Sequence, residues 1–240
     1  MKDNAKITTR FTVIAGLVLT AASSNATVTY FNGYLGTTSE SAGVGAANEL
    51  IFAGDVSNSD LIEGMTPTIT GWTIANGAHP DELTDGIHGD TFAAEGNSVA
   101  GAWTTVGATA EYNLGTGANG LGFDITSIQT IAAWVNVGFA DQAWTIDVQP
   151  VGGSYATLAT VDYDGTTDGG ATKVTLSGLN ATGIEAIRFT ANQVNGGANG
   201  GQFTPRELDV FGTDTVAVPE PSSAALLGLG GLALIFRRRK

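Results

Sequence analysis

The chain of 240 residues contains no cysteine and only two histidines, His79 and His88. The absence of cysteine excludes disulfides, thiol catalysis, iron–sulfur clusters and cysteine zinc sites. The histidines lie in a loop rich in Gly and Asp without the i, i+4 spacing of a helical metal pair, so we interpret them as surface-loop histidines. A chain of this length does not need disulfides, because it can bury a sizeable core.

Basic residues are scarce in the middle of the chain. Seven of the ten Lys and Arg residues fall within the first ten or the last four positions. Between residues 27 and 215, Lys173, Arg188 and Arg206 stand against 21 acidic residues, which gives a net charge of −18, whereas the whole chain has −13. Such a surface repels phosphate backbones, so no nucleic-acid partner is expected. The many carboxylates are suitable ligands for calcium.

Enzyme motifs are missing as well. The sequence has no Gly-x-Ser-x-Gly elbow, no His-Glu-x-x-His and no Walker loop. A glycosidase needs two carboxylates beside the scissile bond, but some pair among so many acids will satisfy this by accident. We therefore predict a protein that is not an enzyme.

The N-terminus has the three parts of a secretory signal peptide. Three basic residues within the first ten positions precede the uncharged and mostly apolar residues 11–22, and small side chains at 24–26 suit cleavage after Ala26. The apolar residues are contiguous, which argues against the alternative of an amphipathic first helix. We expect residues 1–26 to be removed by signal peptidase.

The C-terminus, residues 216–240, shows a second ordered pattern. The motif at 218–223 contains Val218, Pro219, Glu220 and Pro221, the uncharged apolar run follows at 224–236, and the basic tail closes the chain with Arg237, Arg238, Arg239 and Lys240. The prolines end any preceding structure, the run enters the bilayer as a short helix, and the basic residues stay cytoplasmic. The run is short, because about 20 residues are needed to cross a bilayer.

This order of features resembles the PEP-CTERM sorting signal. The resemblance implies that the tail is held temporarily in the inner membrane of a Gram-negative-type bacterium and is processed by an exosortase. It also implies release or transfer to the cell surface or extracellular matrix, often beside exopolysaccharide production. The alternative is a simple tail anchor. The shortness of the run suits a temporary membrane hold better than a permanent transmembrane helix.

The residues between the two ends favour one all-β domain, 27–215. Gly is abundant, with 34 residues, and turn signals recur roughly every ten residues without a long helical pattern. The expected architecture is an antiparallel β-sandwich or jelly roll. The predicted strands cover residues 27–34, 69–74, 110–114, 128–137, 144–149, 155–163, 173–176, 184–191 and 207–211.

Short motifs between Asp81 and Gly212 resemble discoidin-like, galactose-binding-type jelly rolls. The first motif is Leu-Thr-Asp-Gly at 83–86 with Gly-Asp-Thr-Phe at 89–92. The second is the predicted strand Ala-Glu-Tyr-Asn-Leu-Gly at 110–115, and the third is the closing strand at 206–212. Arg188-Phe189 and the closing strand fit the paired last strands of that family. Asn113 departs from the pattern, because Asp is usual there.

The same resemblance implies a structural calcium ion. Asp85, Asp90 and the carbonyl of Thr91 would bind the ion, and Glu207 from the last strand would close the shell. The residues by themselves agree in part, because Asp81, Asp85 and Asp90 fall in one Gly-containing loop. A solvated Asp/Gly turn without an ion is the alternative.

Four tryptophans are candidates for stacking on sugar rings, since aromatic faces suit the apolar faces of sugars. Trp134 and Trp144 lie in apolar strand patterns, which predicts core positions. Trp72 and Trp103 lie nearer to turns and are the freer ligand candidates. Either Arg188 or Arg206 could anchor an acidic sugar, although pairing with a neighbouring Asp or Glu is the alternative role.

Together the two resemblances imply an exported, non-catalytic surface or matrix protein that binds extracellular polysaccharide. One alternative is a structural or adhesion protein of the matrix without a small ligand. A hydrolase of matrix glycans is a third.

Overall fold

The computed structural model describes residues 26–32, 51–74, 80–88, 102–134, 139–164, 170–194 and 201–217. These residues form eight strands and two short 3-10 helices. The strands are β1 (Thr27–Asn32), β2 (Thr68–Ile74), β3 (Ala102–Asn113), β4 (Phe123–Trp134), β5 (Gln142–Pro150), β6 (Ala156–Tyr163), β7 (Gly170–Ala191) and β8 (Pro205–Asp214). The helices are η1 (Ala53–Asp55) and η2 (Pro80–Thr84).

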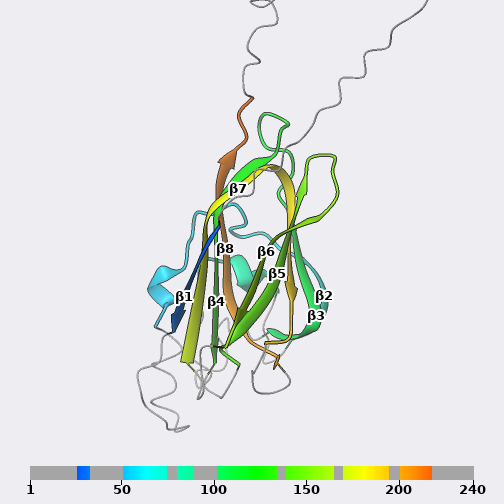
Figure 1. The fold of residues 1–240 in the computed structure, drawn as a ribbon. Helices are drawn as coiled ribbons and strands as arrows, with labels where there is room; N and C mark the ends of the chain where they lie inside the picture. The colour runs from blue at the N-terminus through cyan, green and yellow to red at the C-terminus, as the bar shows by residue number, and fades with distance from the viewer. Residues whose placement is uncertain are drawn as a thin grey trace, which may run out of the picture.

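The eight strands form two antiparallel layers that share β7. The first half of β7 pairs with β1 and β4, and β8 lies beyond β4. The second half pairs with β3 and β5, with β2 and β6 outside them. Figure 1 shows β7 arching over one end of the molecule to join the layers. The fold is therefore the expected antiparallel β-sandwich.

Glycine makes the arch of β7 possible. Gly183 lies in the left-handed region at φ 67°, one residue before Ile184, which pairs with both Phe123 of β4 and Pro150 of β5. Gly122 packs against it so closely that a Cβ at Gly122 would lie 2.6 Å from the carbonyl carbon of Gly183. A side chain at either position would meet backbone strain, and at Gly122 also a backbone clash.

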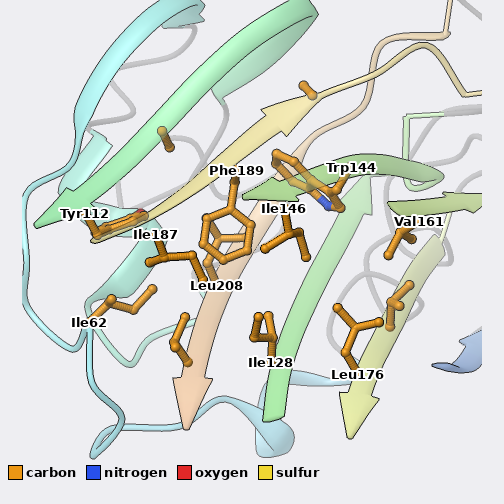
Figure 2. Close-up of a cluster of buried hydrophobic side chains, with 14 of the residues drawn as sticks. Ile62, Tyr112, Ile128, Trp144, Ile146, Val161, Leu176, Ile187, Phe189 and Leu208 are labelled. Atoms are coloured by element: carbon orange, nitrogen blue, oxygen red, sulfur yellow. The ribbon is translucent and has the colours of Figure 1, made fainter. Parts of the chain in front are cut away.

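The core lies between the layers because each strand turns alternate side chains inward. In β5, for example, Trp144 and Ile146 are fully buried. Figure 2 shows the side chains from the two layers meeting, among them Trp144, Ile146 and Phe189 from one layer and Ile128, Leu176 and Leu208 from the other. The Trp144 ring packs edge-on against Phe203, with centroids 4.7 Å apart. Truncating an aromatic of this kind costs about 3–5 kcal/mol.

The outer faces of the two layers differ. Residues 51–57 lie on the outer face of the layer that contains β4 and β8, where Phe52 packs with Ile131, Ala133 and Ala171. The Gln129 amide donates to the Asp55 carbonyl oxygen at 2.7 Å and fixes this segment. On the outer face of the other layer, no helix or strand packs among the residues that the structure describes.

The domain begins and ends at the same end of the sandwich. In the strand register, Thr27 of β1 pairs with Ser177 of β7, and Ser177 also pairs with Ser127 of β4. Ser127 in turn pairs with Phe211, which lies three residues before the end of β8. This is the end over which β7 arches (Figure 1). The two flanking segments therefore join the sandwich at one end.

The structure differs from the strand predictions in several places, among them the start of β4 at Phe123 and not at residue 128. The predicted strands 173–176 and 184–191 are one continuous strand, β7, because glycines at 178 and 183 bend the strand without ending it. The strand predicted at 110–114 begins at Ala102. The resemblance led us to expect paired last strands, but β7 and β8 both pair with β4, on its two opposite edges.

The predicted signal peptide and the apolar run at 224–236 lie outside the described residues. In the described part of the chain, none of the helices has the length and apolar character needed to span a membrane.

Candidate functional site

Buried charge is concentrated on β8. Glu207 and Asp209 point away from the main core, and both are fully buried. The segment before β2 covers them: the Leu61 N–H donates to the Val210 carbonyl oxygen at 2.8 Å, and the Ser57 N–H donates to Asp209 Oδ1 at 3.3 Å. The helix η2 also contacts β8. The fold therefore places two carboxyl groups in a site without access to bulk water.

The loop after η2 reaches Glu207 directly. The Gly86 N–H donates to Glu207 Oε1 at 3.3 Å, and the Asp85 side chain is fixed because its Oδ1 accepts from the Ile87 N–H at 2.9 Å. Gly86 has φ 70°, and a Cβ there would lie 3.0 Å from Glu63 Oε1. Glycine is therefore required for this close approach, and the structure brings together the loop and the glutamate that the sequence singled out.

Five carboxyl groups share this site, and we call them the β8 acidic cluster: Asp60, Glu63, Asp85, Glu207 and Asp209. Burial raises the pKa of Glu207 to about 10, with further contributions from the charges of Asp209 and Asp85. Burial likewise raises the pKa of Asp209 to about 7 and that of Asp60 and Glu63 above their usual values. In the absence of a cation, Glu207 is therefore protonated at neutral pH.

The donor chemistry of the cluster fits a hard cation such as calcium. Three buried oxygens, Glu207 Oε2, Asp60 Oδ2 and Glu63 Oε2, accept no hydrogen bond from the described residues. Within that part of the chain, however, no three Asp, Glu or His groups are arranged to hold a metal ion. Asp90 and Thr91 lie outside it, so the calcium site remains a prediction for which only the Asp85 loop and Glu207 are placed.

The predicted core tryptophans are confirmed: Trp134 is 2% exposed and Trp144 is fully buried. Trp72, a ligand candidate, is half-buried, packs against the core, and donates from Nε1 to the Thr109 carbonyl oxygen at 2.7 Å. The side chain of Trp103, the other candidate, lies outside the described part. Trp72 therefore serves packing in this structure.

The two arginines also have internal partners. Arg188 makes an ion pair with Asp147 at 2.8 Å, and its guanidinium lies 4.2 Å from the ring centroid of Tyr155. Arg206 is fully buried and donates from Nε to the Ala133 carbonyl oxygen at 3.0 Å. This burial does not fit the hypothesis that Arg206 anchors a ligand at the surface.

The structure corrects one interpretation and adds residues to the site. His88 is only 3% exposed, so it is not a surface-loop histidine, whereas His79 lies outside the described residues. Asp60, Glu63 and Asp209 were not singled out from the sequence. Asp209 could have been found, because it lies two residues from Glu207 on a strand and so shares its face. Asp60 and Glu63 reach the site only through the fold.

Replacing the titratable carboxyl group of Glu207 should change how stability depends on pH. A carboxyl whose pKa is higher in the folded state than in the unfolded state stabilises the fold at low pH and loses this contribution as pH rises. In chelator, the melting temperature of the processed protein should fall by about 5 °C or more between pH 6 and pH 8. Glu207→Gln should reduce the fall, as measured by calorimetry, because an amide does not titrate.

Asp164→Asn is the matched control for that measurement, because Asp164 is an exposed carboxylate outside the cluster. It should melt like the wild type at both pH values. If Glu207→Gln kept the full pH dependence of the wild type, Glu207 would not be the titrating group.

Comparison with solved structures finds sugar-binding modules at low identity. They include the Clostridium perfringens module CpGH89CBM32-5 in complex with GalNAc-β-1,3-galactose, with 15% identity, a TM-score of 0.43, and coverage of 64% of this chain and 99% of that one. A Streptococcus pneumoniae fucose-binding module has 13% identity, a TM-score of 0.43, and coverage of 64% and 94%. The family 32 module of C. perfringens NanJ, in complex with galactose, has 18% identity and a TM-score of 0.40, and the match covers 60% of this chain and 91% of that one.

Comparison with curated proteins finds no match. One segment of the chain matches a family model. This segment begins three residues after the end of β8. Residues 217–240 match the PEP-CTERM protein-sorting motif, so the chain ends in an exosortase sorting signal, which implies export and sorting to the cell surface.

Proposed function

We propose that this chain is an exported, non-catalytic protein of the bacterial cell surface or extracellular matrix, and that it binds extracellular polysaccharide. The observation that carries the proposal is the sorting motif at 217–240, directly behind the last strand of the β-sandwich. The motif supports delivery to the surface. The resemblance of the loop at 83–92 and of the closing strand to galactose-binding-type domains supports a saccharide ligand.

The way in which β8 ends suits processing of the tail. Thr215 is tied to the sandwich, because its N–H donates to the Gly122 carbonyl oxygen at 2.9 Å and its hydroxyl donates to Asp124 Oδ1 at 2.5 Å. Cleavage near Pro219–Pro221 would leave these contacts in place. An inner-membrane exosortase can therefore remove the tail without unfolding the domain, after signal peptidase has removed residues 1–26.

A structural calcium ion is part of this proposal. Asp85, Asp90, the carbonyl of Thr91 and Glu207 would hold it, and the ion would balance the negative charge of the β8 acidic cluster. The buried Glu207 Oε2, which has no hydrogen-bond donor in the described part of the chain, supports the assignment.

A structural or adhesion role without a saccharide ligand is the second candidate. Strand β1 lies at the edge of its layer and exposes two aromatic side chains, Tyr30 at 42% and Phe31 at 41%. Exposed edge strands with apolar side chains are prone to pair with other chains. This favours self-association in a matrix.

Deleting residues 218–240 should divert the protein to the periplasm or the medium without changing its melting temperature, because β8 and Thr215 remain. Cell fractionation and immunoblotting would measure the location. Glu220→Ala keeps the apolar run and the basic tail, so it separates sorting from anchoring. If the tail is a processed signal, the Glu220→Ala variant should remain in the membrane as an uncleaved precursor. If its location and mass are the same as those of the wild type, the tail is a simple anchor.

The processed protein should bind at least one class of polysaccharide on a glycan array of neutral, amino and acidic sugars. Fluorescent labelling of the protein gives the readout. A flat array together with calcium-dependent self-association in light scattering would instead establish the structural or adhesion role.

Calcium should raise the melting temperature of the processed protein, because the ion binds only the folded site. At a calcium concentration 100 times its Kd, the gain is about 2.7 kcal/mol, or roughly 5–10 °C. Glu207→Gln should lose most of this shift, and Asp164→Asn should keep it. Identical melting temperatures of the wild type with calcium and with chelator would exclude the site.

A further inference from the structure

The outer face of the β6-β5-β7-β3-β2 layer is polar and is not covered by any described helix or strand. Because hydrophobic side chains of these strands point into the core, the alternate positions form this face. A row of threonines crosses all five strands in register: Thr70, Thr109, Thr190, Thr145 and Thr160. The face is therefore open to a hydrophilic partner.

This face is hollowed close to the arch of β7. The hollow has a volume of about 230 Å³ and is lined by Glu111, Asn113, Gln149, Glu185 and Ala186. In the strand register, Ala186 stands between Asn113 of β3 and Gln149 of β5. Because the side chain of Ala186 is only a methyl group, the longer polar side chains around it leave a hollow above it.

Hydrogen bonds hold the lining side chains in place. Gln149 Nε2 donates to Glu185 Oε1 at 3.0 Å and to the Gly153 carbonyl oxygen at 3.1 Å. Asn113 Oδ1 accepts from the Gly115 N–H at 3.0 Å. Glu185 Oε1 also accepts from the Gly152 N–H at 3.3 Å. The Asn113 amide nitrogen and the second carboxylate oxygen of Glu185 take no part in these hydrogen bonds, so a donor group and an acceptor group remain for a ligand. A site fixed in advance loses less conformational entropy on binding.

An aromatic side chain stands beside the hollow. Burial raises the pKa of the Tyr155 phenol, and the neighbouring Glu111 carboxylate raises it further. The Arg188 guanidinium stacks on the Tyr155 ring at 4.2 Å and is itself held by Asp147 at 2.8 Å. Glu111 and Arg188 are opposite each other in the register. Asp147 and Arg188 therefore position the aromatic ring at the side of the carboxylate.

We propose that this hollow, with Glu111, Asn113, Glu185 and the neighbouring Tyr155, binds a neutral or amino-bearing sugar residue of an extracellular polysaccharide. The inference rests on the proposed function and names the site and the ligand class. Carboxylates accept hydrogen bonds from sugar hydroxyls or an ammonium group, and the amide donates to a ring or hydroxyl oxygen. An aromatic ring packs against the apolar C–H face of a sugar.

Charge decides against acidic sugars at this place. Two carboxylates, Glu111 and Glu185, line the hollow, and the nearby Arg188 is already paired with Asp147. The surrounding domain has a net charge of −18 between residues 27 and 215. A uronate would therefore meet repulsion, and none of the residues that line the hollow is a cation that could offset it.

Three oligosaccharide probes test the inference by isothermal titration calorimetry with the processed protein: a neutral galactan fragment, a chitosan fragment and an alginate fragment. The wild type should bind the neutral or the amino probe and not the alginate. Glu111→Gln should weaken that binding roughly tenfold, because a hydrogen bond to a charged group is lost. Asn113→Ala, at an exposed position, should weaken it as well.

Asp164→Asn is the matched control, since it removes one surface charge away from the hollow and should bind like the wild type. Unchanged melting temperatures would show that all variants are folded. If the wild type binds a neutral or amino probe and both hollow variants bind it equally well, the site is wrong although the proposed function stands. Preferential binding of alginate would overturn the ligand class. Binding to none of these probes and to no glycan on the array would overturn the proposed function itself.

Discussion

The pairing of one strand, β7, with neighbours in both layers is the constraint on which the rest of the sandwich depends. Its first half is hydrogen-bonded to β1 and β4 and its second half to β3 and β5. Ile184, at the change of layer, pairs with residues of both β4 and β5. A break at this point would separate the two halves of the core, so the left-handed backbone of Gly183 and the close packing of Gly122 are structural requirements.

The position of β8 in this arrangement creates the acidic cluster. Because β8 pairs only with β4 among the strands, its free edge is taken up by the segment before β2, where Leu61 binds the Val210 carbonyl oxygen. This cover removes Glu207 and Asp209 from water while the chain supplies few basic residues. Buried carboxyl groups without a cationic partner must take up protons or bind a cation. The stability of the sandwich is thereby coupled to pH.

The two outer faces of the sandwich are covered differently in the described part of the chain. The segment 51–57 covers the face that contains β4, whereas the opposite face is polar and no described helix or strand covers it. The hollow between Asn113 and Gln149 depends on three strands, β3, β7 and β5, that are distant in sequence. Its residues look like ordinary exposed strand positions when they are considered one at a time. Only the register of the strands brings two carboxylates and two amides around the small Ala186.

Much of the fold could be predicted from the sequence, because alternation of apolar residues and turn residues are local signals. These signals indicated the sandwich and most of its strands, and they placed Trp134 and Trp144 in the core, where the structure confirms them. They could not show that residues 173–176 and 184–191 form one strand. Turn-forming residues between them indicate a break, whereas long-range pairing on both sides keeps β7 continuous.

For the site, the sequence by itself determined the sorting signal, because the order of Pro-Glu-Pro, the apolar run and the basic tail is read along the chain without folding. It also indicated Asp85 and Glu207 through a resemblance. The tertiary structure alone decided that Glu207 is buried beside Asp60, that Arg206 is interior, and which polar sheet face the described helices and strands leave uncovered. The burial of a side chain and the charges near it depend on contacts between segments that are far apart in the sequence. Local sequence patterns do not show which distant segments come into contact.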